Sequence, residues 1–294
     1  MAGGIAEGFQ PDDAPIPKPL LPINGKPVSE FVIHALEQSN VEKIFIVQDE
    51  GAGLEQALTY GPKCVFINKE KAHASLGMGL FFAMERVAEY YDPVELKDRS
   101  IMFVPCDIPL VTKDTFNRLI TLAAGAPADV TITIISTDLL DERFPGKSFR
   151  GIYLSEYRST YTMQNVIFVD GGFIQLRTDP GPGNLRFSFR GWDDKVLDRV
   201  VAGIDSIQTL RRRSHFYDKL FLIWLLTKGY SGYIFKFLMD LLLKRATMAR
   251  IIQYLNGADH MQAGYIVSEE AECSADIDSP EDLHILVGNS LQNG

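Results

Sequence analysis

The sequence has 294 residues, of which 46% are hydrophobic and 23% are charged, and its formal net charge is −9. These values exclude a disordered or fibrous protein, because the chain is long and apolar enough to bury a large core. The acidic balance argues against a nucleic-acid polymer as a partner, since such binding depends on basic surface that neutralises phosphates.

The cysteine spacing and the length of the apolar runs indicate the cellular compartment in which we expect the protein. Cys64, Cys106 and Cys273 are widely spaced and form no Cys-x-x-Cys pair, so we expect neither a disulfide framework nor a zinc site. The N-terminus shows no signal peptide. The run LFLIWLL at 220–226 is far shorter than the roughly 20 residues that cross a bilayer. We therefore expect a cytoplasmic protein.

Residues 28–136 alternate between helical and strand patterns. The spacing of apolar residues predicts helices over 28–38, 54–60, 75–91 and 112–124, the last capped by Thr112. Nearly continuous apolar runs predict strands over 43–48, 63–68, 101–105 and 129–136. Strands that alternate with helices predict a parallel sheet with helices on both faces.

The alternation ends after residue 136. Short β-like runs between turn residues predict an antiparallel insertion over 144–184, and residues 206–256 read as helical. A final helix is expected after Ser279 as N-cap, with Pro280 at its first position. We predict an α/β fold: a three-layer, Rossmann-like mixed sheet, mostly parallel and flanked by helices, with an antiparallel insertion and a C-terminal helical subdomain.

Two N-terminal stretches could bind an anion. The small residues Ala2, Gly3 and Gly4 let a backbone approach a ligand closely. The segment PKPLLPINGKP at 17–27 offers Lys18 and Lys26 as positive charges. Flexible glycines and solvated lysines are the alternative interpretation of each stretch taken alone.

Three further stretches carry polar residues at element ends. Ser75 and Gly77 lie at the start of the helix 75–91, where backbone N–H groups suit a phosphate, although close helix packing explains them equally well. Asp107 follows the strand 101–105, and Asp278 precedes the last helix. Two such aspartates could jointly hold Mg²⁺, while a turn or a helix cap is the alternative. Asp276 could join the metal or fix the turn.

Together, AGG, KPLLPINGKP, CDIPLVT and DIDSPEDL, in this order over nearly the whole chain, resemble the MobA-like NTP transferases of the nucleotide-diphosphosugar transferase, or GT-A, superfamily. The resemblance implies a Mg²⁺-dependent nucleotidyltransferase that transfers NMP from an NTP to a small phosphorylated acceptor and releases pyrophosphate. It also implies that Lys18 and Asp107 are catalytic. The implied nucleotide-binding residues are Ala2, Gly3, Gly4, Lys18, Ser75 and Gly77, the metal ligands Asp107 and Asp278, and the acceptor-binding residues Gly171 and Gly172.

The resemblance suggests a division of one domain, 1–294, into two halves. Residues 1–136 would bind the nucleotide, and residues 137–294, with the helical insertion 206–256, would bind the acceptor. The aromatic and basic residues of 206–243, including Arg211 to Arg213, permit two interpretations. They form a helical subdomain packed on the sheet, or an amphipathic surface that makes peripheral membrane contact.

Departures from the family pattern leave two alternatives open. The glycines stand at residues 3 and 4 without a strand before them, and the arginine usual in the family's glycine loop is absent. Both motivate a non-catalytic, nucleotide-binding or regulatory relative of the same fold. A GT-A glycosyltransferase that uses a nucleotide sugar ranks last, because Asp107 lacks the second aspartate of an Asp-x-Asp pair.

Overall fold

The structure is a computed structural model that describes residues 5–6, 16–69, 76–149, 151–178, 185–190, 240, 243–259 and 261–292. Its helices and 3-10 turns are η1 (Lys18–Leu20), α1 (Val28–Gln38), α2 (Leu54–Ala57), α3 (Leu76–Tyr90), α4 (Pro93–Lys97), α5 (Lys113–Ala124), α6 (Thr137–Arg143), η3 (Gly171–Phe173), α10 (Met248–Asp259), η4 (Ala271–Ser274) and α11 (Pro280–Gln292). Its strands are β1 (Ile5–Ala6), β2 (Ile16–Pro17), β3 (Pro22–Ile23), β4 (Lys26–Pro27), β5 (Ile44–Asp49), β6 (Cys64–Lys69), β7 (Ser100–Phe103), β8 (Val130–Ser136), β9 (Ile152–Leu154), β10 (Ser159–Asp170), β11 (Ile174–Thr178), β12 (Leu185–Phe189) and β13 (Ala263–Val267).

The expected alternation over 28–136 is confirmed, and local capping explains where two helices begin. The Thr112 Oγ1 accepts from the N–H of Thr115, whose own hydroxyl accepts from the N–H of Thr112, so a capping box begins α5. The Ser279 Oγ accepts from the N–H of Asp282 at the start of α11. The short helices α4 and α6 were not among the predicted elements.

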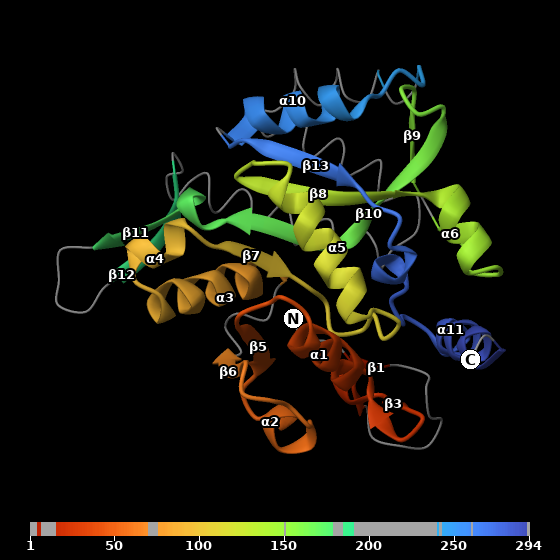
Figure 1. The fold of residues 1–294 in the computed structure, drawn as a ribbon, viewed down its shortest axis with the longest axis horizontal. Helices are drawn as coiled ribbons and strands as arrows, with labels where there is room; N and C mark the ends of the chain where they lie inside the picture. Colours follow the sequence, from red (N-terminus) through yellow and green to blue (C-terminus); the bar gives the residue numbers. More distant parts are fainter. Residues whose placement is uncertain are drawn as a thin grey trace.

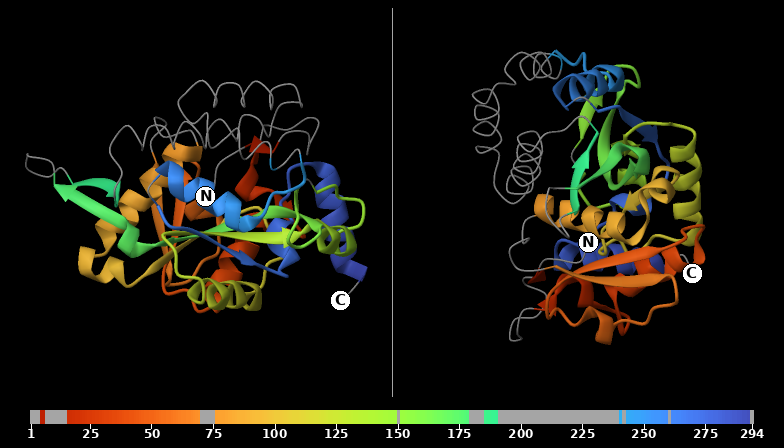
Figure 2. Two further views of the ribbon diagram at one scale, coloured as in Figure 1. Left: turned by 90° about the horizontal axis from the view of Figure 1, so that it is seen from above. Right: turned by 90° about the vertical axis from the view of Figure 1, so that its left-hand side faces the viewer.

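The mixed α/β class is also confirmed (Figure 1). One sheet has the order β13-β8-β10-β7, with β9 paired to β10, and β5 pairs with β6 in a separate sheet. Among the described pairs, β13–β8 and β5–β6 are parallel, and those of β10 are antiparallel. Part of the predicted insertion thus lies in the central sheet as β10. Figure 2 shows α5 on one face of this sheet and α10 on the other.

Two apolar clusters determine how the elements pack. The larger one joins buried side chains of α1, β5 and α5 to one face of the central sheet that contains β10 and β13. Phe116, Leu119 and Val166 are fully buried in it. The second joins the N-terminal segment to the C-terminal one through Leu21, Ile23, Ile277 and Leu286. The second cluster therefore holds residues far apart in the sequence at one place.

Most of the predicted helical segment 206–256 lies outside the described residues, as does nearly all of the proposed membrane surface 206–243. The end of this segment forms the first part of α10, which packs on β13. Within the described parts of the chain, no helix has the length and apolar character needed to cross a membrane.

Candidate functional site

Lys18 begins η1 and is held by the fold of the segment around it. The carbonyl of Pro19 accepts a hydrogen bond from the Ser29 Oγ at 2.8 Å, and Pro19 itself is buried. The chain then turns through β3 and β4, where Asn24 and Gly25 both have positive φ angles of 51° and 81°. Asn-Gly favours this hairpin turn because both residues tolerate that backbone region. The segment KPLLPINGKP therefore folds as a 3-10 turn followed by a tight β3–β4 hairpin, and Lys18 lies at its start.

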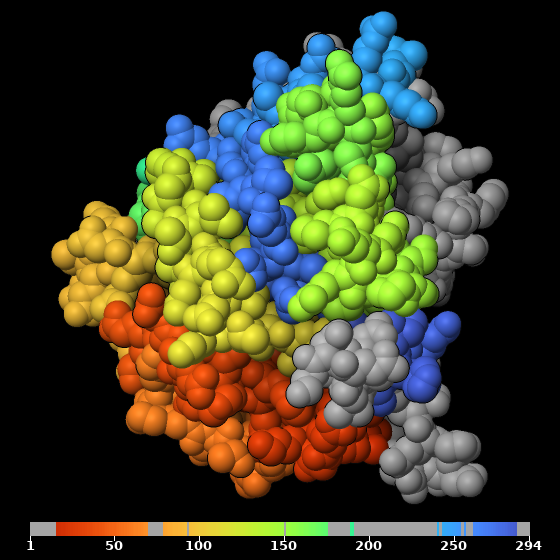
Figure 3. Space-filling model, turned by 45° about the vertical axis from the view of Figure 1, so that its right-hand side comes forward, coloured from red at the N-terminus to blue at the C-terminus, as the bar shows by residue number. Residues whose placement is uncertain are grey.

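Asp107 and Asp278 each stand next to a fully buried isoleucine. Ile108 and Ile277 have exposed fractions of 0%, so the backbone beside each aspartate is anchored in the core. The N–H of Ile277 donates to the carbonyl of Asp107 at 3.0 Å, which joins the two loops directly. Figure 3 shows the chain after β13, in blue, as it passes between the yellow α5 region and the green α6 region toward the red N-terminal part.

These loops bring Lys18, Asp107 and Asp278 together. The Nζ of Lys18 lies 2.5 Å from the Oδ2 of Asp107 and 2.6 Å from the Oδ1 of Asp278. The side chains of Lys18 and Asp107 are only 15% and 16% exposed, whereas that of Asp278 is 70% exposed. Burial alone would lower the pKa of Lys18, but the two carboxylates outweigh it and hold the pKa above its ordinary value. The lysine is therefore firmly cationic.

A second lysine, Lys147, lies beside this group and has no counterpart in the sequence prediction. Its Nζ contacts the carbonyl of Asp276 and lies 3.0 Å from the Oδ1 of Asp282 and 3.5 Å from the Oδ1 of Asp276. Burial, followed by the charge of Asp278, raises the pKa of Asp276 to about 6. Burial alone would also raise the pKa of Asp278. The hydrogen bond that the Asp278 carboxylate accepts from Lys18 outweighs burial and holds the pKa of Asp278 below its ordinary value.

The charges of this group fit a divalent cation. Two lysines face four aspartates, which leaves a formal excess of two negative charges. The carboxylates of Asp107 and Asp278 already converge on one cation, the ammonium of Lys18. No cluster of three or more His, Cys, Asp or Glu side chains suited to a metal occurs in the described part of the chain. Two carboxylates completed by substrate phosphates are the arrangement that Mg²⁺ favours.

The structure does not bring every predicted site residue to this group. Ala2, Gly3, Gly4 and Ser75 lie outside the described residues. Gly77 is the second residue of α3, and nothing in the structure tests its predicted contact with a nucleotide.

Gly171 and Gly172 lie at the opposite end of β7 from Asp107. The register pairs Asp170 with Ser100, at the start of β7, whereas Asp107 follows its end. A Cβ on Gly171 would lie 1.8 Å from the carbonyl oxygen of Leu96, so the glycine is required by close backbone packing. The predicted role in acceptor binding is untested, but these two residues are not part of the lysine and aspartate group.

The fold and the site together define a class of protein. Ligands of α/β proteins bind beyond the carboxyl ends of sheet strands, and here that region holds a cationic lysine and paired aspartates, which suit a nucleotide phosphate and its metal. The chain belongs to the family described as the MobA-like NTP transferase domain, whose model matches residues 1–148, more than half of the sequence. Nucleotidyl transfer is the reaction class of this family.

One solved structure supports the fold, and two others are reported with lower similarity. A hypothetical transferase from Thermus thermophilus is similar with a TM-score of 0.64 and 22% identity, over 96% of this chain and 96% of that one. A 4-diphosphocytidyl-2C-methyl-D-erythritol synthase from Anaerococcus prevotii matches with a TM-score of 0.49 and 11% identity, over 94% and 91% of the two chains. A putative glucose-1-phosphate thymidylyltransferase from Bacillus anthracis matches with a TM-score of 0.44 and 11% identity, over 94% and 86%.

Proposed function

We propose that the protein is a Mg²⁺-dependent nucleotidyltransferase that transfers NMP from an NTP to a small phosphorylated acceptor in the cytoplasm. One observation carries this proposal: the Nζ of Lys18 lies 2.5 Å from the Oδ2 of Asp107 and 2.6 Å from the Oδ1 of Asp278. These contacts bring three distant segments of the chain together. Since the cysteines Cys64, Cys106 and Cys273 are all free thiols, the chain is suited to a reducing compartment.

The proposed reaction is a displacement at phosphorus. An oxygen of the acceptor phosphate attacks the α-phosphorus of the NTP, and the bond from that phosphorus to the oxygen bridging to the β-phosphate breaks. The electron pair of this bond leaves with pyrophosphate, so one phosphorus–oxygen bond forms as another breaks. Such chemistry needs positioning and charge stabilisation rather than a covalent nucleophile.

We assign metal binding, phosphate binding and loop positioning to different residues of this chain. Asp107 and Asp278 would hold Mg²⁺, which supplies charge neutralisation at the phosphates and a fixed orientation for them. Lys18 would bind oxygens of the β- and γ-phosphates and offset their negative charge. Lys147 acts as a positioning residue, because its contacts with Asp276 and Asp282 fix the loop that carries Asp278.

A nucleotide panel tests this proposal. The melting temperature would be measured with ATP, GTP, CTP and UTP, each with and without Mg²⁺, for the wild type, Asp107→Asn and Asp114→Asn. Asp114 is an exposed acidic residue in the first turn of α5 and serves as the matched control. We expect one NTP to stabilise the wild type and the control only when Mg²⁺ is present, and the Asp107 variant to lose this response.

A turnover assay distinguishes the proposed enzyme from a non-catalytic nucleotide-binding relative. Pyrophosphate release would be followed with the stabilising NTP and a set of phosphorylated sugars, polyols and phosphoacids. Release with one acceptor supports the transferase. Stabilisation by an NTP without release for any acceptor of these classes would favour a nucleotide-binding regulator, and no response to any NTP would contradict both.

A further inference from the structure

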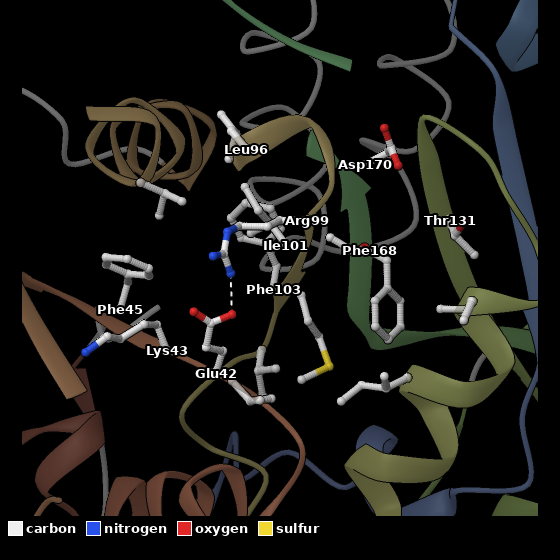
Figure 4. Close-up of a pocket in the computed structure, with 18 of the residues that line it drawn as sticks. Glu42, Lys43, Phe45, Leu96, Arg99, Ile101, Phe103, Thr131, Phe168 and Asp170 are labelled. Carbon is white, nitrogen blue, oxygen red and sulfur yellow. Dashed lines mark hydrogen bonds and ion pairs between the residues drawn. The ribbon is translucent and has the colours of Figure 1, made fainter. Parts of the chain in front are cut away.

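Strand β10 runs past the carboxyl end of β7, from which the chain leads to Asp107. The register pairs Ile167 of β10 with Phe103, the last residue of β7, and the two strands are antiparallel. The residues that precede Ile167 in β10 therefore extend beyond the end of β7, toward Asp107. Figure 4 shows β10 between its neighbours, with Phe103 on β7, Phe168 on β10 and Thr131 on β8.

A bulge interrupts β10 in this part of the strand. Between Met163 and Ile167 the register with β8 shifts, so that three residues of β10 face one residue of β8. Gln164 is the first of these three residues. Bulges turn a side chain in a new direction and are frequent next to active sites.

The side chain of Gln164 is costly for the stability of the fold. It is 1% exposed, and its Nε2 donates to the carbonyl of Glu270 at 2.6 Å. Within the described part of the chain, its Oε1 has no hydrogen-bond partner. A buried acceptor without a partner destabilises the folded state, and an apolar side chain of similar shape would avoid that cost. The need for a stable core therefore does not account for this glutamine.

Glu270, which Gln164 binds, is held at each of its polar groups. Its N–H donates to the Oγ of Ser268 at 2.9 Å. Its carboxylate accepts from both the Nε and the Nη2 of Arg118, which comes from α5. Together with the bond from Gln164 to its carbonyl, these contacts make Glu270 a fixed point of the chain after β13.

A short and mostly buried segment leads from Glu270 to Asp278, and we name residues 268–278 the strap. Three residues of the strap are 0% exposed: Cys273, Ala275 and Ile277. The last of them donates its N–H to the carbonyl of Asp107 at 3.0 Å. Because these residues are packed in the core, a shift of the strap at Glu270 is passed on to Asp278.

We propose that Gln164 is a positioning residue for nucleotidyl transfer: its hydrogen bond to Glu270 holds the strap where the Asp278 carboxylate meets the metal beside Asp107. This inference rests on the proposed function, because it assigns Gln164 a role that acts through a metal ligand. The Asp278 side chain is 70% exposed, so its position depends on the backbone that carries it. Residues that support a metal ligand in this way typically strengthen metal binding by about tenfold or more.

Gln164→Met tests this role, because it removes the donor and the unpartnered oxygen together and keeps the length of the side chain. The carbonyl of Glu270 stays paired, since it also accepts from the N–H of Cys273 at 3.2 Å. Thr133→Val is the matched control. The Thr133 Oγ1 donates to the carbonyl of Val166 at 2.7 Å, a bond within the same bulge that does not involve the strap.

We expect the two variants to separate stability from metal binding. In EDTA, Gln164→Met should melt at the wild-type temperature or above it, and Thr133→Val should melt lower, because it loses a buried hydrogen bond. Binding of Mn²⁺ would be followed by water proton relaxation, with ATP, GTP, CTP and UTP each present in turn. Gln164→Met should weaken the Mn²⁺–NTP complex about tenfold or more, and Thr133→Val should leave it unchanged. In Asp278→Asn, adding Gln164→Met should cause no further loss, because both act on one ligand.

Unchanged Mn²⁺ binding in Gln164→Met, alongside a loss in Asp278→Asn, would overturn the inference and leave the proposed function standing. An equal loss from Gln164→Met with and without the Asp278 carboxylate would also overturn it. No Mn²⁺–NTP binding by the wild type would overturn the proposed function, and this inference with it. If Gln164→Met does not fold, Arg118→Gln loosens the same Glu270 from a side chain that is 58% exposed, and unchanged Mn²⁺ binding there would overturn the inference.

Discussion

From the contact of Lys18 with both carboxylates we predict a change in thermal stability that can be measured without a substrate. In metal-free buffer, Lys18→Met leaves the partly buried Asp107 and its neighbour Asp278 without the cation that they share. Removing one partner of such a hydrogen-bonded charge group costs about 1–3 kcal/mol. The melting temperature should therefore fall by roughly 2–12 °C, at about 2–4 °C per kcal/mol for larger domains.

Mg²⁺ should reverse this loss. In the wild type, a metal between the carboxylates must displace an ammonium that lies 2.5 and 2.6 Å from them. In water, a single and a double charge about 4 Å apart repel each other by about 2 kcal/mol. Without nucleotide, Lys18→Met should therefore bind Mg²⁺ about ten- to thirtyfold more tightly than the wild type.

The assay is thermal unfolding over a Mg²⁺ titration, with EDTA as the starting point. Lys26→Met is the matched control, because Lys26 lies in the same segment, on β4, but is exposed and away from the cluster. The reasoning is refuted if Lys18→Met is as stable as Lys26→Met without metal, or if Mg²⁺ stabilises the two variants equally.

Three further predictions concern other positions. Gly171→Ala should destabilise the protein by about 2–4 kcal/mol in urea unfolding, because its Cβ meets the backbone of Leu96, and should cost clearly more than Gly172→Ala, whose Cβ meets a side chain. Since the pKa of Asp276 is raised to about 6, its contribution to stability is present below about pH 4 and lost as the pH rises through about 6. In EDTA, Asp276→Asn should be neutral at pH 4 and stabilising by about 2–3 kcal/mol at pH 8; an unchanged pH profile would contradict this. Thr112→Ala should cost about 1 kcal/mol through loss of its capping box, and a neutral result would contradict it.

The helices α1, α3, α5 and α11 could be predicted from the sequence because their signals are local. Thr112 and Ser279 cap the helices that follow them, as the sequence indicates. The assignment of Lys18, Asp107 and Asp278 to one group depends on the resemblance, and in the structure the Nζ of Lys18 contacts both carboxylates. The distances among these three side chains depend on the packing of Ile277 in the apolar core, and no local sequence pattern predicts that packing.

Features that depend on distant pairing could not be predicted. The run at 159–170 reads as a strand in an insertion, but its partners β7 and β8 place it in the central sheet. Lys147 follows Gly146 in a turn and belongs to no motif, so only its contacts with Asp276 and Asp282 reveal it.

The central claim is that Asp107 and Asp278 hold a divalent metal together with an NTP. The most direct test is electron paramagnetic resonance of Mn²⁺, a substitute for Mg²⁺, titrated into the wild type, Asp107→Asn and Asp278→Asn with the stabilising NTP present. Removal of a ligand carboxylate should weaken Mn²⁺ binding at least about tenfold in each variant, as loss of a metal ligand or its support does. Mn²⁺ binding that is unchanged in both variants would contradict the account.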